Sequence, residues 1–208
     1  ITFNSNEPFY VDEEKTLYLN KYEDYKEYLS NDAPSYELLY QTLKENKNIP
    51  KDYRNAIKQI IQLFEQEEIA PENLGIFYEN LRNLEIITDY VSKDSVSAYF
   101  VADPDHPSVY IDENIVDFYT FLHEIIHSCH EAKIRYEDKL IVITSGGIKK
   151  QKVDENIVAI QLYGNSFQEG QTECITQYFC KQSDRIYLSA YTYNINTNIL
   201  EFWMNTLN

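Results

Sequence analysis

The stretch FLHEIIHSCHE, residues 121–131, decides how the rest of the chain is interpreted. It holds three of the chain's four histidines, and two of them, His123 and His127, are four residues apart. That spacing places two side chains on one face of a helix, one turn apart, where two imidazoles can bind a single metal ion. Because Glu124 lies beside them on the same helix, the segment matches the HExxH motif of zinc sites.

The residues around this motif predict a helix over 114–134 with one buried face. An apolar stripe runs along it at helical spacing, formed by Phe118, Leu122, Ile125 and Cys129. His123 and His127 lie off that stripe. His130 lies about 10 Å along the helix axis from His123, too far for one ion to bind both, so we expect it at the rim or on the surface. A helix whose histidines are solvated and bind no metal stays the alternative.

A tetrahedral zinc site needs a third protein ligand, and we expect it in SFQEGQTE, residues 166–173. Glu169 and Glu173 carry like charges one helical turn apart, which is unfavourable unless a cation or an imidazole intervenes. Zinc bound by Glu169, with Glu173 accepting a hydrogen bond from a ligand histidine, removes that repulsion. A second interpretation stays open, in which Ser166 and Glu169 form a capping box at the start of this helix.

HEIIH followed by NSFQEGQTE resembles the gluzincin branch of the zincin metallopeptidases, and more narrowly the bacterial HExxH proteins whose second helix carries EGxTE. The resemblance covers about residues 96–182. It implies one Zn²⁺ as cofactor, Glu169 as the third zinc ligand and Glu173 as the support of a ligand histidine. The stretch between His127 and Glu169 is longer than in many gluzincins, and an inserted hairpin at residues 140–153 accounts for the difference.

We therefore expect a zinc-dependent metallopeptidase that hydrolyses peptide bonds of a peptide or protein substrate. Glu124 is predicted to take a proton from a zinc-bound water and deliver it to the leaving amine. The oxyanion needs one more donor, and Tyr163 is a candidate, although it could equally serve only in packing. Tyr187, Tyr191 and Tyr193 are further candidates.

Two other predictions concern partners. By resemblance to zincins, the strand SVYI at 108–111 lines the substrate cleft, and an interior strand is the equally weighted alternative. The alternative function is a zincin-like zinc-binding interaction module without proteolytic activity, whose partner surface is the helical segment 35–90. The intact base Glu124 argues against that alternative.

The pattern along the chain predicts an α+β fold that is zincin-like, with a small, mostly antiparallel sheet packed on the HExxH helix and a helical N-terminal lobe. We expect one domain over residues 1–208, with the lobe at 1–95 and the catalytic part at 96–208. The predicted elements are a short strand and a surface helix within 1–32, helices from Ser35, from Pro50 and from Pro71 toward Tyr90, a hairpin over 97–113, two strands around Gly146-Gly147, and helices at 166–182 and 198–208.

The composition and net charge of the chain limit the classes of partner that it can bind. The formal charge of −16 argues against nucleic acid or an anionic membrane, and no apolar run reaches membrane-spanning length. Three cysteines without CxxC spacing argue against a disulfide scaffold. The chain begins at Ile1 and ends on an apolar segment, so we expect a removed leader or a trimmed start, and further chain after residue 208. A secreted or cell-surface location and a cytoplasmic one both stay open, as do the oligomeric state and the cleavage specificity.

Overall fold

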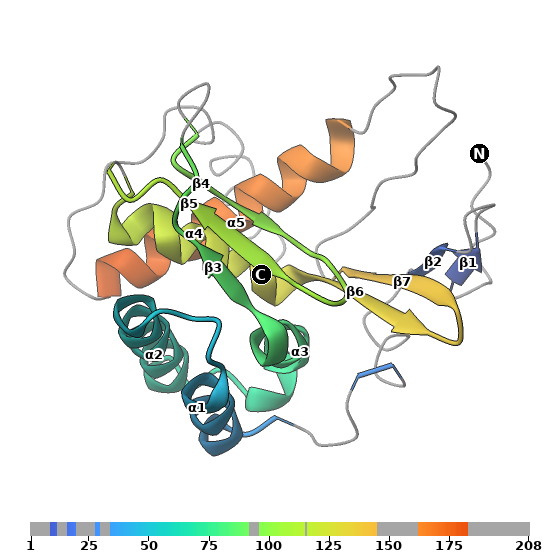
Figure 1. The fold of residues 1–208 in the computed structure, drawn as a ribbon, viewed down its shortest axis with the longest axis horizontal. Helices are drawn as coiled ribbons and strands as arrows, with labels where there is room; N and C mark the ends of the chain where they lie inside the picture. The colour runs from blue at the N-terminus through green and yellow to red at the C-terminus, as the bar shows by residue number, and fades with distance from the viewer. Residues whose placement is uncertain are drawn as a thin grey trace, which may run out of the picture.

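The computed structural model describes residues 9–11, 16–19, 28–29, 34–91, 96–114, 116–144 and 162–182. Within these residues the chain is α+β, as predicted, with five α-helices and two small sheets (Figure 1). The elements are β1 (Phe9–Val11), β2 (Thr16–Leu19), α1 (Tyr36–Glu45), α2 (Lys51–Gln66), the 3₁₀ turn η2 (Pro71–Leu74), α3 (Gly75–Asn83), β3 (Glu85–Ile87), β4 (Ala98–Val101), β5 (Ser108–Ile111), α4 (Phe118–His130), β6 (Glu131–Tyr136), β7 (Lys139–Thr144) and α5 (Leu162–Gln182). The predicted surface helix within 1–32 and the predicted helix at 198–208 lie outside the described residues.

Two mixed sheets form where the sequence predicts one mostly antiparallel sheet. The first has the order β1-β2-β7-β6, in which β2 and β7 are parallel and the other neighbours antiparallel. The second has the order β3-β5-β4, in which β3 and β5 are parallel and β5 and β4 antiparallel. Three of the five pairings between described strands are antiparallel, but the strands divide between two sheets, and β3 forms in a segment that helical periodicity predicts as the end of a helix.

The helices predicted from Ser35 and from Pro50 are confirmed as α1 and α2. The Ser35 side chain accepts a hydrogen bond from the Leu38 backbone amide at 3.1 Å, so Ser35 caps the start of α1. Helix α2 begins directly after Pro50, which has no amide proton to leave unpaired. Its predicted apolar face is buried, with Ile57, Ile60, Ile61 and Phe64 at most 2% exposed.

The third predicted helix ends earlier than expected, at Asn83 rather than near Tyr90. A buried side chain from the end of α1 accounts for the stop. The Asn46 amide nitrogen donates to the backbone carbonyls of Leu81 and Leu84, both at 2.9 Å. These carbonyls are thereby paired without further helix, and the chain continues as β3 beside β5.

Helix α4 likewise ends before the predicted position, at His130 instead of residue 134. The reason again lies in another helix. Asn80 of α3 is 3% exposed, and its amide nitrogen donates to the carbonyls of Ser128 and Glu131, both at 2.7 Å. The side chain of Asn80 therefore closes the end of α4, and β6 begins at the next residue.

Strands β6 and β7 form a hairpin around Glu137 and Asp138, which have φ angles of 46° and 61°. Two consecutive residues of positive φ are typical of a two-residue hairpin turn. The sequence predicts β7 correctly as a strand but pairs it with a second strand beyond Gly146-Gly147. That second strand falls in residues 145–161, outside the described residues.

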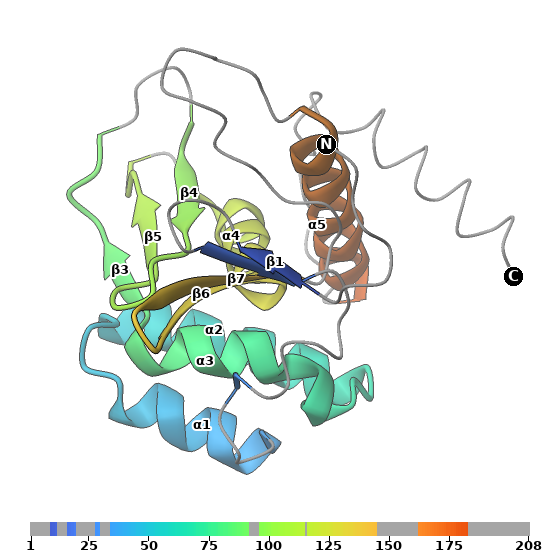
Figure 2. The same ribbon diagram turned by 90° about the vertical axis from the view of Figure 1, so that its right-hand side faces the viewer.

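Helix α4 lies between the sheet β3-β5-β4 and helix α5 (Figure 2). Helices α2 and α3 also pack against α4. Its predicted inner positions Leu122 and Ile125 are both 0% exposed. They belong to a core shared by helices α1 to α5 and the three-stranded sheet. None of the described helices combines the length and the apolar character that a membrane crossing requires.

The predicted hairpin over 97–113 is confirmed as β4 and β5, which pair antiparallel with Tyr99 opposite Tyr110. Strand β5, which is the SVYI segment, has β3 on one side and β4 on the other. It is therefore the interior strand of its sheet, which is the second of the two predicted roles, and it has no open edge with which to pair an extended substrate. Strand β4 lies at the edge of this sheet and contacts α4.

Candidate metal centre

The predicted HExxH residues lie on a helix whose start and orientation are fixed locally. The Asp117 side chain accepts a hydrogen bond from the Thr120 amide at 2.8 Å and so caps α4 six residues before His123. Since the apolar stripe of α4 is buried in the core, His123 and His127 face helix α5 instead. Helix α5 covers them closely enough that the His123 side chain is only 9% exposed.

Three side chains of α4 and α5 bring one atom each to a common point. The Nε2 atoms of His123 and His127 lie 3.2 Å apart. The Oε2 atom of Glu169 lies 3.3 Å from the first and 3.2 Å from the second. Among the residues that the structure describes, these three form the group of metal-ligating side chains able to share an ion.

The size of this triangle fits zinc. Ligand atoms about 2.0–2.1 Å from a tetrahedral ion lie about 3.3–3.4 Å from each other. The three distances, 3.2, 3.2 and 3.3 Å, are close to that value. A single cation at this point would contact all three atoms at once.

Charge in the site favours a cation as well. Burial opposes the ionised form of Glu169, but hydrogen bonds from His123 and His127 outweigh it and lower its pKa to about 2. Burial likewise opposes the charged form of His123, but hydrogen bonds to Glu169 and Glu173 outweigh it and raise its pKa to about 9. Without a metal the cluster therefore keeps a proton on His123, in the position that a cation would take.

The outer ring nitrogens of both histidines have partners of their own. His123 Nδ1 lies 3.2 Å from Glu173 Oε2, as the sequence predicts for Glu173. His127 Nδ1 lies 3.4 Å from the Thr172 hydroxyl. A proton held on Nδ1 leaves the lone pair of Nε2 directed at the common point, which is the tautomer that a metal ligand requires.

Glu124 lies next to His123 on α4 and is 7% exposed. Burial raises the pKa of its carboxyl group, and a backbone hydrogen bond from Phe100 of β4 acts in the opposite direction. A carboxylate of raised pKa is a stronger base, which suits proton transfer near neutral pH. The Glu169 side chain, by contrast, is 30% exposed, so the cluster is open to solvent on that side.

Some predicted features fall elsewhere. Helix α5 begins at Leu162, four residues before Ser166, so the capping-box interpretation of Ser166 and Glu169 is wrong. Tyr163 lies in the first turn of α5, but its side chain is outside the described residues. The other tyrosine candidates, residues 187, 191 and 193, are outside them too. His130 is half-buried rather than on the open surface, and burial together with the nearby His127 lowers its pKa to about 4.

The sequence analysis did not identify Thr172, Tyr119 or Gln177. The Tyr119 hydroxyl donates to Glu173 Oε1, and Gln177 Nε2 donates to the same oxygen at 3.0 Å. One signal could have found two of these residues. Polar side chains recur every four residues along both helices, Tyr119, His123 and His127 on α4 and Glu169, Glu173 and Gln177 on α5.

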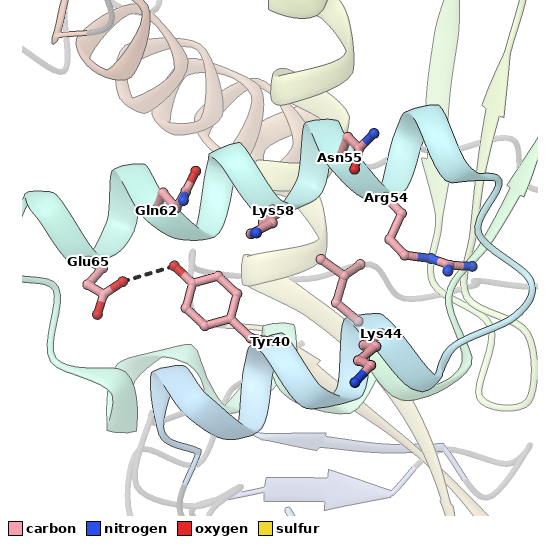
Figure 3. A pocket seen from close by; sticks show the side chains of 8 residues that line it. Tyr40, Lys44, Arg54, Asn55, Lys58, Gln62 and Glu65 are labelled. Carbon is pink, nitrogen blue, oxygen red and sulfur yellow. Dashed lines mark hydrogen bonds between the residues drawn. The ribbon is translucent and has the colours of Figure 1, made fainter.

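A second polar region is a surface groove of about 560 Å³ between α1 and α2 (Figure 3). Its cations are Lys44, Arg54 and Lys58. The Arg54 guanidinium donates to the carbonyls of Asn46 and Ile49, at 3.1 and 2.9 Å, and so closes the loop between the helices. The remaining lining residues are Tyr40, Leu43, Asn55, Gln62 and Glu65, with Tyr40 donating to Glu65 at 2.9 Å.

In comparisons with known proteins, no family model, no curated protein and no solved structure matches this chain. The chemistry of the chain is therefore inferred from its own atoms. Those atoms offer two imidazoles and a carboxylate in a zinc-sized triangle, with a buried carboxylate beside them.

Proposed function

We propose that this chain is a zinc-dependent metallopeptidase of the gluzincin type, with a zincin-like catalytic part. The observation that carries the proposal is the triangle of His123, His127 and Glu169 atoms at 3.2–3.3 Å, in the order along the chain that HExxH and EGxTE predict. The residues fit the ion in charge, donor type and spacing.

His123, His127 and Glu169 would hold the zinc ion, which when bound would act as a Lewis acid toward a carbonyl group and lower the pKa of water. Glu124 acts as the general base, taking a proton from the water whose oxygen attacks the carbonyl carbon of the peptide bond. The same carboxyl group then returns the proton to the leaving nitrogen as the C–N bond breaks. Burial supports this role, because it raises the pKa of Glu124 toward the pH at which it must both accept and donate.

Strand β4 is the element best placed to hold the substrate. It is the edge strand of its sheet among the described residues, and its Phe100 backbone hydrogen-bonds to Glu124. An extended peptide that pairs with β4 would run past the base and the zinc ligands. The substrate-binding strand predicted at 108–111 is thus replaced by its neighbour in the sheet, Ala98–Val101.

The alternative function is a zincin-like module that binds zinc and a partner without cleaving it. Both functions need His123, His127 and Glu169, but only hydrolysis needs Glu124. The burial of Glu124 next to the proposed ligands favours the peptidase, because burying a carboxylate costs free energy that a purely binding module has no catalytic reason to spend.

Cleavage of a peptide library tests the proposal. Wild-type protein loaded with zinc should cleave, the chelated protein should not, and Glu124→Gln should bind zinc normally but lose about 10²–10⁴-fold in kcat/KM. Cleavage that survives Glu124→Gln would remove Glu124 from the mechanism. Zinc binding without any cleavage by the wild type, including digests of folded proteins, would favour the module.

A further inference from the structure

The two ligand histidines are supported by different chemistry on the side away from the triangle. His127 Nδ1 meets a neutral hydroxyl, that of Thr172, at 3.4 Å. His123 Nδ1 meets the Glu173 carboxylate at 3.2 Å. A charged acceptor binds an N–H more strongly than a neutral one, so the orientation of the His123 ring depends on where Glu173 is held.

Glu173 is itself fixed through its second oxygen. Its Oε1 accepts from the Tyr119 hydroxyl and from Gln177 Nε2, while its Oε2 faces His123. Burial, and then Glu173, hold the pKa of Tyr119 well above its usual range, so the phenol keeps its proton and donates. The two donors on one oxygen fix the plane of the carboxylate and leave the other oxygen to the imidazole.

The contact between Tyr119 and Glu173 is shielded from water, with Tyr119 7% exposed and Glu173 1% exposed. Gln177 is half-buried. The Tyr119–Glu173 hydrogen bond therefore counts for more than it would at a surface. Tyr119 and His123 are one turn apart on α4, and Glu173 and Gln177 one turn apart on α5, so the helices themselves set the spacing.

We propose that Tyr119 is a positioning residue of the metal centre, which acts through Glu173 to hold the His123 ring in its zinc-binding orientation and so raises zinc affinity. This inference rests on the proposed zinc site and extends it by two residues, Tyr119 and Gln177. Among the described residues, His127 Nδ1 meets the Thr172 hydroxyl rather than a carboxylate, so we expect the effect at His123 alone.

Zinc affinity, measured by competition with a chromophoric chelator, tests this in four proteins: wild type, Tyr119→Phe, Glu173→Gln and the double variant. Glu173→Gln should weaken binding about 10–100-fold, as the loss of a ligand's supporting carboxylate does. Tyr119→Phe should weaken it about tenfold, the effect of one hydrogen bond to a charged group. The double variant should bind like Glu173→Gln alone, because Tyr119 acts only through Glu173.

Two further variants separate positioning from general damage. Tyr40→Phe removes a tyrosine hydroxyl from a carboxylate, that of Glu65, in the groove between α1 and α2, and should leave zinc affinity unchanged. Gln177→Leu removes the other donor to Glu173, and with it the contact of Gln177 with the Tyr119 hydroxyl, but keeps the Tyr119 ring, which packs in the core. It should weaken zinc binding about threefold even if Tyr119→Phe folds poorly.

The outcomes distinguish this inference from the proposed function. If the wild type binds zinc and Tyr119→Phe binds it equally well, the positioning role is overturned while the zinc site stands. The positioning role is also overturned if Tyr119→Phe weakens zinc binding by the same factor in the Glu173→Gln variant as in the wild type. A wild type that binds no zinc overturns both.

Discussion

The α4–α5 interface and the groove between α1 and α2 both collect charged side chains, but they arrange them differently. At the interface, atoms from residues more than forty positions apart meet within 3.2–3.3 Å, as His127 and Glu169 do. In the groove, Figure 3 shows the charged ends of Lys44, Arg54 and Lys58 lying apart from one another. Arg54 is also committed to two backbone carbonyls. Convergence of metal-ligating atoms on one point, rather than the size of a hollow, is what marks a candidate metal site.

The two regions should also differ in how the removal of a metal ion affects them. We propose that a cation completes the interface, whereas in the groove Arg54 donates to backbone carbonyls and Tyr40 donates to Glu65. The predictions below test that difference, beginning with the largest expected change.

Removal of zinc should destabilise the protein strongly. At a free zinc concentration about 1,000 times Kd, binding adds about 4 kcal/mol to the free energy of unfolding, because only the folded chain brings the three ligands together. For a chain of this size that corresponds to about 8–16 °C in Tm. Calorimetry with and without a chelator measures this change in Tm. A Tm that does not depend on the chelator would mean that the α4–α5 interface, like the groove, binds no stabilising zinc ion.

Zinc affinity should rise with pH up to about pH 9. In the metal-free protein His123 has its pKa raised to about 9, so below that pH zinc must displace a proton. The affinity should therefore increase about tenfold per pH unit between pH 7 and 9 and then level off. Titration in chelator-buffered zinc measures this slope, and an affinity that does not change over this range would contradict the protonated His123.

The same pKa makes a prediction for the metal-free protein alone. A raised pKa stabilises the folded state fully below the ordinary value of 6.5, and this stabilisation is lost as the pH rises through 9. Chelated protein should thus lose stability from pH 6.5 to 9. Chemical denaturation at several pH values checks the sign, with the zinc-loaded protein as the control that should lack this loss.

Asn80→Leu should cost about 2–4 kcal/mol of stability. It leaves the carbonyls of Ser128 and Glu131 buried without their donor at the end of α4. Asn55→Leu, at an exposed position in the groove, is the matched control and should change stability by less than about 0.5 kcal/mol. Urea denaturation compares the two, and equal effects would mean that α3 does not fix the end of the HExxH helix.

Charge reversal in the groove should have the smallest effect. Lys44→Glu combined with Lys58→Glu changes the charge of an exposed surface that contains none of the proposed zinc ligands. Zinc affinity and peptide cleavage should therefore stay within about twofold of wild type. Chelator competition and the cleavage assay measure both. A larger loss in either would show that the groove takes part in the site.

The features that the sequence predicts correctly are the local ones. Two histidines four residues apart share a helix face in any protein, so His123 and His127 could be paired without knowledge of the fold. Glu169 and Glu173 could be chosen because like charges one turn apart need a partner. The caps of α1 and α2 at Ser35 and Pro50 are likewise set by adjacent residues.

The features that it misses depend on distant segments. The ends of α3 and α4 are fixed by Asn46 and Asn80, side chains from other helices that periodicity does not reveal. Residues 131–134 continue the helical pattern of α4 but form the first part of β6, because pairing with β7 decides their conformation. The contact of Tyr119 with Glu173 needs the antiparallel register of α4 and α5, which a single-segment pattern does not contain.

The most direct test of the central claim is the zinc content of purified wild-type protein beside Glu169→Ala and His123→Ala. We predict one zinc per chain in the wild type and none in either variant, with circular dichroism showing that all three proteins are folded. Full zinc in Glu169→Ala would contradict the assignment of the third ligand and, with it, the gluzincin proposal. No zinc in the wild type, even after reconstitution, would contradict the metal centre itself.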